Sequence, residues 1–106
     1  EAVIAVVAIL NKHHKGELYF GINDKGDVVG QEVSDKTLRD VGQAISNNIE
    51  PKIFPKIEKI EIEGKSCIKI LFECQESPYF AYGRAYIRVG TENKQMSAQE
   101  LKKIFG

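Results

Sequence analysis

The sequence predicts a single α+β domain, a mixed or antiparallel sheet of about five to six strands with two to three helices. Its 106 residues are enough for one domain with one hydrophobic core. Contents of 42% hydrophobic and 28% charged residues are ordinary for a soluble globular protein. The segments follow the order apolar segment, two strands, helix, two strands, one or two strands and helix, which is typical of an α+β domain.

The opening segment, residues 2–10, is ambiguous. Its valines and isoleucines favour a strand, whereas its length and its alanines permit a buried helix. Nine apolar residues are too few to cross a bilayer, which takes about 20, and they follow no charged leader. We therefore expect no membrane partner. Because the chain starts inside an element and without methionine, we expect it to be a piece of a longer protein.

Residues 16–33 are predicted to form two strands around a turn. Leu18, Phe20 and Ile22 share one face of the first strand. The turn NDKGD contains Gly26, which can adopt a positive φ, and VVGQEV continues as a returning strand.

Residues 34–50 are predicted to form an amphipathic helix. Ser34 is suited to the N-cap and Asp35 to the first turn. Pro51 is expected to close the helix. The apolar stripe has spacings of three, four and four residues: Leu38, Val41, Ile45 and Ile49.

The second half supplies a β-hairpin, further strands and a closing helix. Residues 51–74 are predicted to form the hairpin, with Gly64 and Lys65 as its turn. Residues 76–90 supply one or two strands, in which Gly83 marks a turn or a bulge. Residues 97–105 are expected to form a short helix that begins with a capping box of Ser97 and Glu100.

The charge balance gives no whole-surface attraction for nucleic acid. Fifteen basic residues balance fifteen acidic ones, with a net of −3 in residues 1–50 and +3 in residues 51–106. Any basic patch must therefore come mainly from the second half. Cys67 and Cys74 lie roughly 23 Å apart on one extended strand, too far to bridge, so we expect reduced thiols and a cytoplasmic protein.

The sequence lacks the motifs of several enzyme classes. It has no Ser-His-Asp or Cys-His arrangement, no Walker phosphate loop and no GxGxxG after a strand, so we expect no cofactor. The adjacent His13 and His14 have no third ligand at a workable spacing, which favours a solvated loop over a metal site. Asp24 and Asp27 flank the turn glycine, and turn hydrogen bonds are a commoner use of such a pair than cation binding.

The segment YGRAYIRVG carries the strongest functional pattern. With the two-residue period of a strand, one face carries Ala85, Ile87 and Val89. Bases stack on aromatic rings and arginine pairs with phosphate, so the other face could contact nucleic acid. The alternative is the exposed face of a half-buried strand, whose charges pair with neighbours such as Glu73 or Glu76. The row in question is Tyr82, Arg84, Tyr86 and Arg88.

Two long segments resemble a known family. ILN followed by KGELYFGINDKGDVVG resembles the signature of the Schlafen AlbA-type DNA-binding domain. SPYFAYGRAYIRVGTENKQMSAQEL resembles the closing pattern of that family, in which a tyrosine-bearing strand leads to Arg-Val-Gly. The resemblance runs in order over essentially the whole chain. It is especially close to N-terminal domains of bacterial multidomain proteins described as transcriptional regulators, RecG-like helicase-related proteins or ATP-binding proteins.

This resemblance implies one AlbA-like domain over residues 1–106, a fragment of a longer multidomain protein. It implies that the opening segment is a helix packed on the sheet and ending near Asn11. Some Schlafen relatives cut structured RNA with two upstream glutamates and an aspartate that corresponds to Asp24. Those upstream acids are not part of this chain, so we expect the fragment itself not to be catalytic. Lys15 and Gly16 replace the usual glycine pair of the family.

We therefore predict a nucleic-acid-binding domain, with DNA as the ligand, of a bacterial transcriptional regulator or helicase-related protein. Its contacts are predicted in the tyrosine–arginine row, with Lys12 and Lys15 as helpers. One alternative is part of a metal-dependent ribonuclease domain, with Asp24 as a metal ligand. Another is a protein-interaction module, in which the aromatic row joins the domain to a downstream domain or to a second copy.

Overall fold

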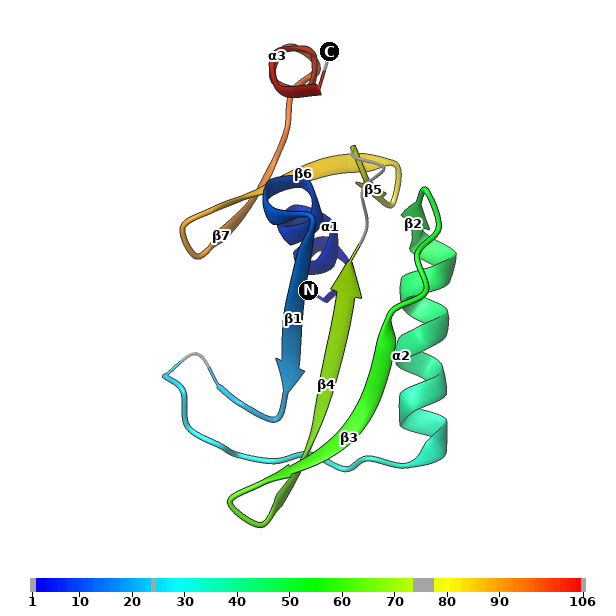
Figure 1. The fold of residues 1–106 in the computed structure, drawn as a ribbon, viewed down its shortest axis with the longest axis vertical. Helices are drawn as coiled ribbons and strands as arrows, with labels where there is room; N and C mark the ends of the chain where they lie inside the picture. The colour runs from blue at the N-terminus through cyan, green and yellow to red at the C-terminus, as the bar shows by residue number, and fades with distance from the viewer. Residues whose placement is uncertain (1, 24, 74–77, 106) are drawn as a thin grey trace.

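The ambiguous opening segment is a helix. The computed structural model describes residues 2–23, 25–73 and 78–105, and its first element is α1, Ala2–His13. In Figure 1, α1 lies between two sheets, and it packs against β1 and β4 of one and β5 and β6 of the other. Because it is covered on both sides, Val6, Val7 and Leu10 are fully buried. This position explains why the segment has no polar face.

The larger part of the core lies on a three-stranded antiparallel sheet. It contains β1 (Lys15–Phe20), β3 (Lys56–Ile62) and β4 (Lys65–Glu73) in the order β1-β4-β3. Leu18 lies opposite Ile70, which lies opposite Ile57, so the three side chains share the inner face. The inner face of this sheet is the one that packs against α1 and α2.

Helix α2, Asp35–Asn48, begins as predicted and ends earlier than predicted. The Ser34 hydroxyl accepts a hydrogen bond from the Thr37 amide, and Thr37 bonds back to the backbone of Ser34. Ile45 is buried, and Leu38 and Val41 pack against the core. The helix stops at Asn48 rather than at Pro51, because the chain becomes extended and enters the second sheet.

The predicted returning strand over VVGQEV does not form. After β1 only an isolated bridge joins Ile22 to Val28, and the Gly21 carbonyl accepts from the amides of Val29 and Gly30. The segment then crosses the end of the sheet. There the Gln31 amide donates to the Ser66 carbonyl.

The turn between β3 and β4 lies one residue earlier than predicted. Glu63 and Gly64, with φ of +53° and +75°, form the two-residue turn, and Lys65 already belongs to β4. Two successive positive φ values are characteristic of a type I′ turn, whose twist matches a β-hairpin.

The second sheet is also antiparallel and has four short strands. They are β2 (Ile49–Glu50), β5 (Phe80–Ala81), β6 (Arg84–Val89) and β7 (Glu92–Gln95), in the order β2-β5-β6-β7. The predicted α+β class is confirmed, with the strands divided between two sheets. The molecule measures 46 × 27 × 19 Å, and the second sheet lies toward one end of its long axis (Figure 1).

Helix α3, Ala98–Phe105, lies beyond the second sheet at that end (Figure 1). The predicted capping box is present, because the Glu100 amide donates to Ser97 and the Ser97 amide donates to the Glu100 carboxylate. None of its residues is buried, although Leu101 and Phe105 are half-buried. Over the described residues, no helix combines the length and apolarity that a membrane span requires.

Candidate nucleic-acid interface

The predicted tyrosine–arginine row begins in a turn rather than in a strand. Tyr82 and Gly83 connect β5 to β6 with φ of +53° and +78°, and Arg84 is the first residue of β6. Gly83 is therefore a turn residue, one of the two roles predicted for it. Tyr82 is 51% exposed at the tip of this hairpin.

The face of β6 that carries the predicted row turns toward the core. Arg84 lies opposite Ala81, and Ala81 lies opposite Ile49, so these side chains project to one side of the sheet. Ile49 and Ala81 are almost completely buried, and Tyr86 packs against the same core. The predicted exposure holds for Arg84 but not for Tyr86, whose partly buried ring is poorly placed for stacking on a base.

The opposite face is not a continuous interior either. Ala85 is buried, and its carbonyl accepts a hydrogen bond from the amide of the buried Met96. Val89, predicted to be interior, is 51% exposed. Strand β6 is thus covered at some residues on each face and exposed at others. A prediction from two-residue alternation assigns each face as wholly buried or wholly exposed, so it cannot describe this pattern.

Asn11 attaches this hairpin to α1. Its side-chain amide donates to the carbonyls of Tyr79 and Tyr86 at 3.0 and 2.8 Å, and its oxygen accepts from the Tyr79 amide at 2.7 Å. The side chain is buried, with 4% of the residue exposed, and all three bonds reach across more than sixty positions of sequence. Asn11 therefore fixes where β6 lies relative to the end of α1.

The two arginines have different environments. Arg88 is half-buried, and its guanidinium donates to the Asn93 side-chain oxygen at 2.7 Å and to the Gly90 carbonyl at 3.2 Å. Arg84 is exposed. Within the described ranges neither arginine forms an ion pair with a carboxylate. Glu76, a predicted partner, lies outside the described residues.

Lys12 and Lys15 are exposed at the end of α1 and the start of β1. Lys12 directly follows Asn11, so its backbone lies next to the hydrogen bond from the Asn11 side chain to the Tyr86 carbonyl of β6. The exposed His13 and His14 lie between the two lysines. Within the described part of the chain, no three histidine, cysteine, aspartate or glutamate side chains are placed to hold a metal ion.

The acidic turn is stabilised by an asparagine. Asp24, the proposed metal ligand of the ribonuclease alternative, lies outside the described residues. The Asn23 side-chain oxygen accepts from the amides of Lys25 and Asp27 at 3.0 and 2.9 Å, and Gly26 has the predicted positive φ. Asp27 is exposed.

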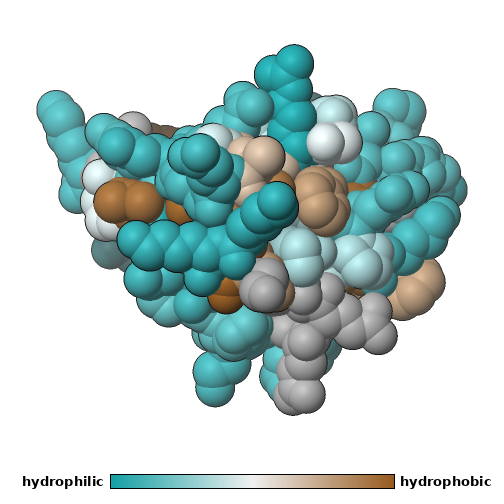
Figure 2. Space-filling model, turned by 90° about the horizontal axis from the view of Figure 1, so that it is seen from above, coloured by the Kyte–Doolittle hydropathy of each residue, from teal (hydrophilic) through white to brown (hydrophobic). Residues whose placement is uncertain are grey.

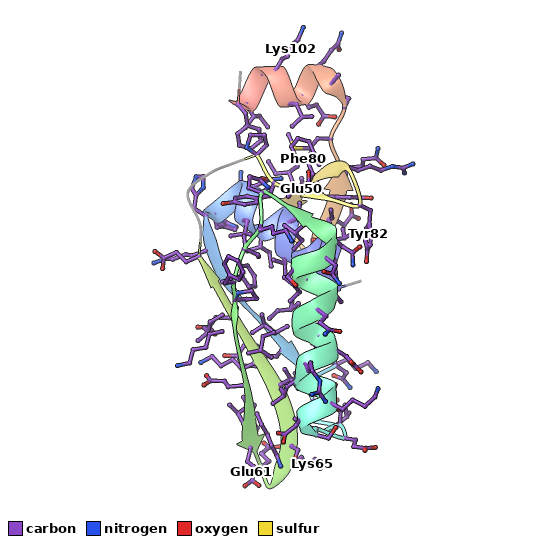
Figure 3. The ribbon with its side chains drawn as sticks, turned by 90° about the vertical axis from the view of Figure 1, so that its right-hand side faces the viewer. Glu50, Glu61, Lys65, Phe80, Tyr82 and Lys102 are labelled. Atoms are coloured by element: carbon purple, nitrogen blue, oxygen red, sulfur yellow. The ribbon has the colours of Figure 1, made fainter. Side chains whose placement is uncertain are left out.

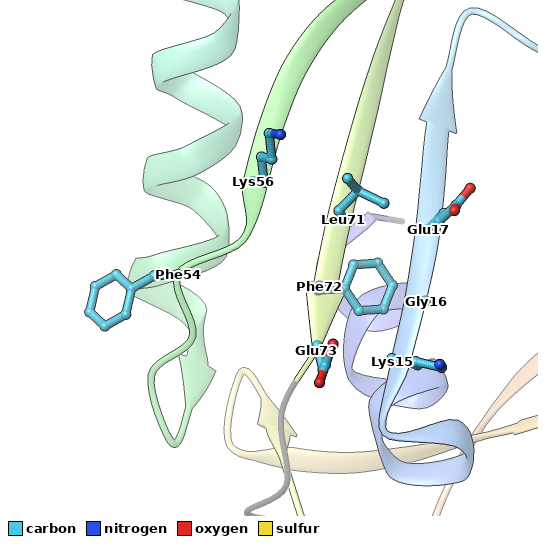
Figure 4. Close-up of a pocket in the computed structure, with 8 residues that line it drawn as sticks. All are labelled: Lys15, Gly16, Glu17, Phe54, Lys56, Leu71, Phe72 and Glu73. Carbon is cyan, nitrogen blue, oxygen red and sulfur yellow. The ribbon is translucent and has the colours of Figure 1, made fainter.

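The outer face of the three-stranded sheet is hollowed but electrically mixed. A hollow of about 670 Å³ lies across β1, β4 and the start of β3 (Figure 4). Both signs of charge line it, with Phe54 at its edge 87% exposed. Nearby, Glu17 accepts from the Tyr19 hydroxyl at 2.6 Å, which raises the pKa of that phenol above its usual 10.0. The charged residues of the hollow are Lys15, Glu17, Lys56 and Glu73.

A smaller hollow lies beside the tip of the β5–β6 hairpin, and we did not predict it from the sequence. Its volume is about 240 Å³, and it joins the end of α2 to the hairpin. Glu50 and Phe80 also line an adjoining hollow of about 540 Å³. Only the aromatic character of SPYFAYG could have pointed to it. It is lined by Asn47, Asn48, Glu50, Phe80, Tyr82 and Gly83.

The family model described as Schlafen, AlbA_2 matches residues 2–97 of this chain. The chain belongs to the Schlafen AlbA_2 family. The match includes α1, both sheets and the β5–β6 hairpin, which confirms the resemblance seen in the sequence. No significant relative is found among curated proteins.

Two solved structures share the AlbA_2 fold. The DIP2311 protein of Corynebacterium diphtheriae has a TM-score of 0.75 and 20% identity over 99% of the chain. The N-terminal domain of a RecG-related protein of Nitrosomonas europaea has a TM-score of 0.59 and 24% identity over 91% of the chain. The chain spans 19% of the Corynebacterium protein and 74% of the Nitrosomonas domain. The first relative is thus far longer than this AlbA_2 domain.

Proposed function

We propose that this AlbA_2 domain binds nucleic acid, with DNA as its principal ligand, within a bacterial transcriptional regulator or helicase-related protein. The observation that carries the proposal is the exposure of Tyr82 and Arg84 together at the tip of the β5–β6 hairpin. An arginine can hold a phosphate through two hydrogen bonds, and an exposed phenol ring can stack on a base or sugar.

We restrict the proposed contact set to the exposed members of the row. Tyr86 packs against the core and Arg88 is bonded to Asn93, so we assign them to the support of the hairpin. Lys12 and Lys15 are exposed and remain candidates for phosphate contacts.

Supporting context comes from the relatives. The Nitrosomonas structure carries a name related to the ATP-dependent DNA helicase RecG, and its domain is N-terminal. A balanced net charge of +0 implies weak binding on its own, which is consistent with a domain that acts beside others in a longer chain.

The proposal is tested by titrating labelled duplex and single-stranded DNA with the domain at about 50 mM salt. We expect binding with a Kd below about 100 μM, and a loss of about tenfold or more in the Tyr82→Asn/Arg84→Ala double variant. Asparagine suits the positive φ at position 82, so the variant keeps the turn while removing the ring. Absence of binding by the unmodified domain, or unchanged binding by a folded double variant, rejects the proposal.

A second candidate function, a protein-interaction module, is favoured by α3. Its apolar residues Leu101, Ile104 and Phe105 lie along one side, and Ile104 is 52% exposed. A helix of eight residues is marginally stable without packing. Figure 2, which looks down on this end of the molecule, shows separate hydrophobic patches among mainly hydrophilic residues.

Light scattering over a concentration series tests this second candidate. If α3 joins two copies, the mass should rise with concentration in the unmodified domain and stay at 11.9 kDa in an Ile104→Lys variant. A constant monomer mass for both proteins contradicts self-association through α3.

A further inference from the structure

The small hollow at the hairpin has walls of a particular chemistry. Phe80 and Tyr82 supply two aromatic rings, Asn47 an exposed amide and Glu50 an exposed carboxylate. In Figure 3, Glu50, Phe80 and Tyr82 lie at the same end of the molecule, far from Glu61 and Lys65. Aromatic rings next to hydrogen-bonding groups are the combination that binds a single unstacked base.

Backbone pairing fixes the positions of the residues that line this hollow. Glu50 lies opposite Phe80 where β2 pairs with β5. The Tyr82 amide donates to the Asn48 carbonyl at 3.0 Å, which ties the hairpin tip to the end of α2. The Asn48 side chain donates to the Ala44 carbonyl at 2.8 Å and so is already engaged. Asn47 and Glu50 are therefore the side chains left to recognise a ligand edge.

A cation lies beside the hollow. Lys52 lines the adjoining hollow together with Glu50, Pro51, Pro78 and Phe80. Arg84 follows Gly83, a lining residue, but its side chain projects to the face of the sheet opposite Glu50 and Phe80. A strand that places a base beside Phe80 can thus have a flanking phosphate near Lys52.

We propose that this hollow binds one unstacked nucleobase of a single-stranded nucleic acid, with a preference for bases that carry an amino group. The inference rests on the proposed function and names the ligand of the same hairpin. A carboxylate only accepts hydrogen bonds, so Glu50 can bond the amino group of cytosine but not the equivalent carbonyl of thymine. A base paired within a duplex cannot enter, because both of its faces are stacked.

Oligodeoxycytidine and oligothymidine of equal length test the specificity, because the two bases have the same size. The unmodified domain should bind oligodeoxycytidine about fivefold more tightly than oligothymidine. Glu50→Gln should reduce this ratio to about one, because a glutamine amide can bond either base. Glu61→Gln is the matched control, an exposed glutamate at the opposite end, and should keep the ratio (Figure 3).

Phe80→Leu tests the stacking wall while keeping an apolar side chain of similar volume in the half-buried position. We expect it to weaken binding of both oligonucleotides about tenfold and to leave duplex binding unchanged. Phe54→Leu makes the same change at a residue that is 87% exposed and lines the hollow on the outer face of the three-stranded sheet. It should leave the affinity for both oligonucleotides unchanged. Circular dichroism of each variant establishes that the fold is kept.

The outcomes separate this inference from the proposed function. If the unmodified domain binds neither duplex nor single strands, the proposed function fails and the base site fails with it. If the domain binds DNA but Phe80→Leu and Glu50→Gln match their controls, the base site is rejected and the proposed function stands. A lost cytosine preference in Glu50→Gln together with weaker single-strand binding in Phe80→Leu supports the base site.

Discussion

The two ends of the molecule differ in how they use their polar residues. The body consists of α2 and the β1-β4-β3 sheet, and the arm consists of the β2-β5-β6-β7 sheet and α3. Both ion pairs found among the described residues lie in the body, Lys36–Asp40 at 2.9 Å and Lys56–Glu58 at 3.8 Å. The arm presents Arg84 without such a partner among the described residues, beside the exposed ring of Tyr82. Two charge pairs thus form within the body, whereas an arginine and an aromatic ring are exposed together at the hairpin tip of the arm.

Helix α1 connects these regions and belongs to both. Its fully buried residues contact each sheet, and Asn11 provides the polar link to the arm. The position of the exposed hairpin therefore depends on a buried side chain of another element. The following changes test the two regions and the link between them, from the largest expected effect to the smallest.

Asn11→Ala should have the largest effect, because it removes three buried hydrogen bonds between α1 and the arm. We expect the free energy of unfolding to fall by about 2–4 kcal/mol, because buried donors and acceptors lose their partners. Urea denaturation measures this fall. Asn23→Ala, which removes two bonds in an exposed turn, should cost less than about 1 kcal/mol. Equal losses would show that Asn11 is not a special link.

Gly16→Ala tests the packing of α1 on the body. A Cβ at position 16 would lie 2.6 Å from Cγ2 of Ile9 and 3.0 Å from the Phe72 ring. Because Phe72 is buried, we expect a loss of about 1–3 kcal/mol from overpacking, measured as a lower urea midpoint. A variant as stable as the unmodified domain would mean that this contact is loose.

Gly42→Ala makes the same chemical change on the other side of the body. It should raise the free energy of unfolding, whereas Gly16→Ala should lower it. Its Cβ would meet only Cδ1 of Ile57, at an ordinary 3.5 Å, inside helix α2. Alanine restricts the unfolded chain and favours a helix, so the free energy of unfolding should rise by about 0.5–1 kcal/mol. Destabilisation would indicate that α2 and β3 are closer than the structure shows.

The pH dependence of α3 should give the smallest effect. Hydrogen bonds from Ser97 hold the pKa of Glu100 below its usual 4.5. Because the pKa is lowered in the folded state, the contribution of the cap is present above pH 4.5 and is lost as pH falls through the folded pKa. Helical circular dichroism should fall over that range, and less so in Glu100→Gln. An identical pH profile in the two proteins would contradict this role of the carboxylate.

The body was the more predictable region, because its elements are specified by local patterns. The Ser34 cap and the stripe of Leu38, Val41 and Ile45 follow from helical periodicity, and α2 has them where predicted. The strand predicted over VVGQEV failed because Asn23 closes the turn and the following residues bond to Gly21 and Ser66. The bonds to Asn23 and Gly21 are local, and the Gln31–Ser66 bond is tertiary; alternation encodes neither kind.

The candidate site was less predictable, because burial in the arm is set by elements distant in sequence. The alternation in YGRAYIRVG correctly placed Arg84, Tyr86 and Arg88 on one face of a strand. It could not show that α1 covers that face at Tyr86 and leaves it open at Arg84. The hollow beside Phe80 combines residues of α2, β2 and β5, and it exists only in the folded chain.

The central claim is that the arm, rather than the body, contacts nucleic acid. Arg84→Ala and Lys36→Ala each remove one exposed positive charge, the first from the arm and the second from α2. Fluorescence anisotropy across a series of salt concentrations measures affinity and salt slope for both variants. We predict that Arg84→Ala weakens DNA binding about fivefold and reduces the slope by about 0.9, while Lys36→Ala leaves both unchanged. Equal effects of the two substitutions would contradict the claim, because binding would then depend on net charge alone.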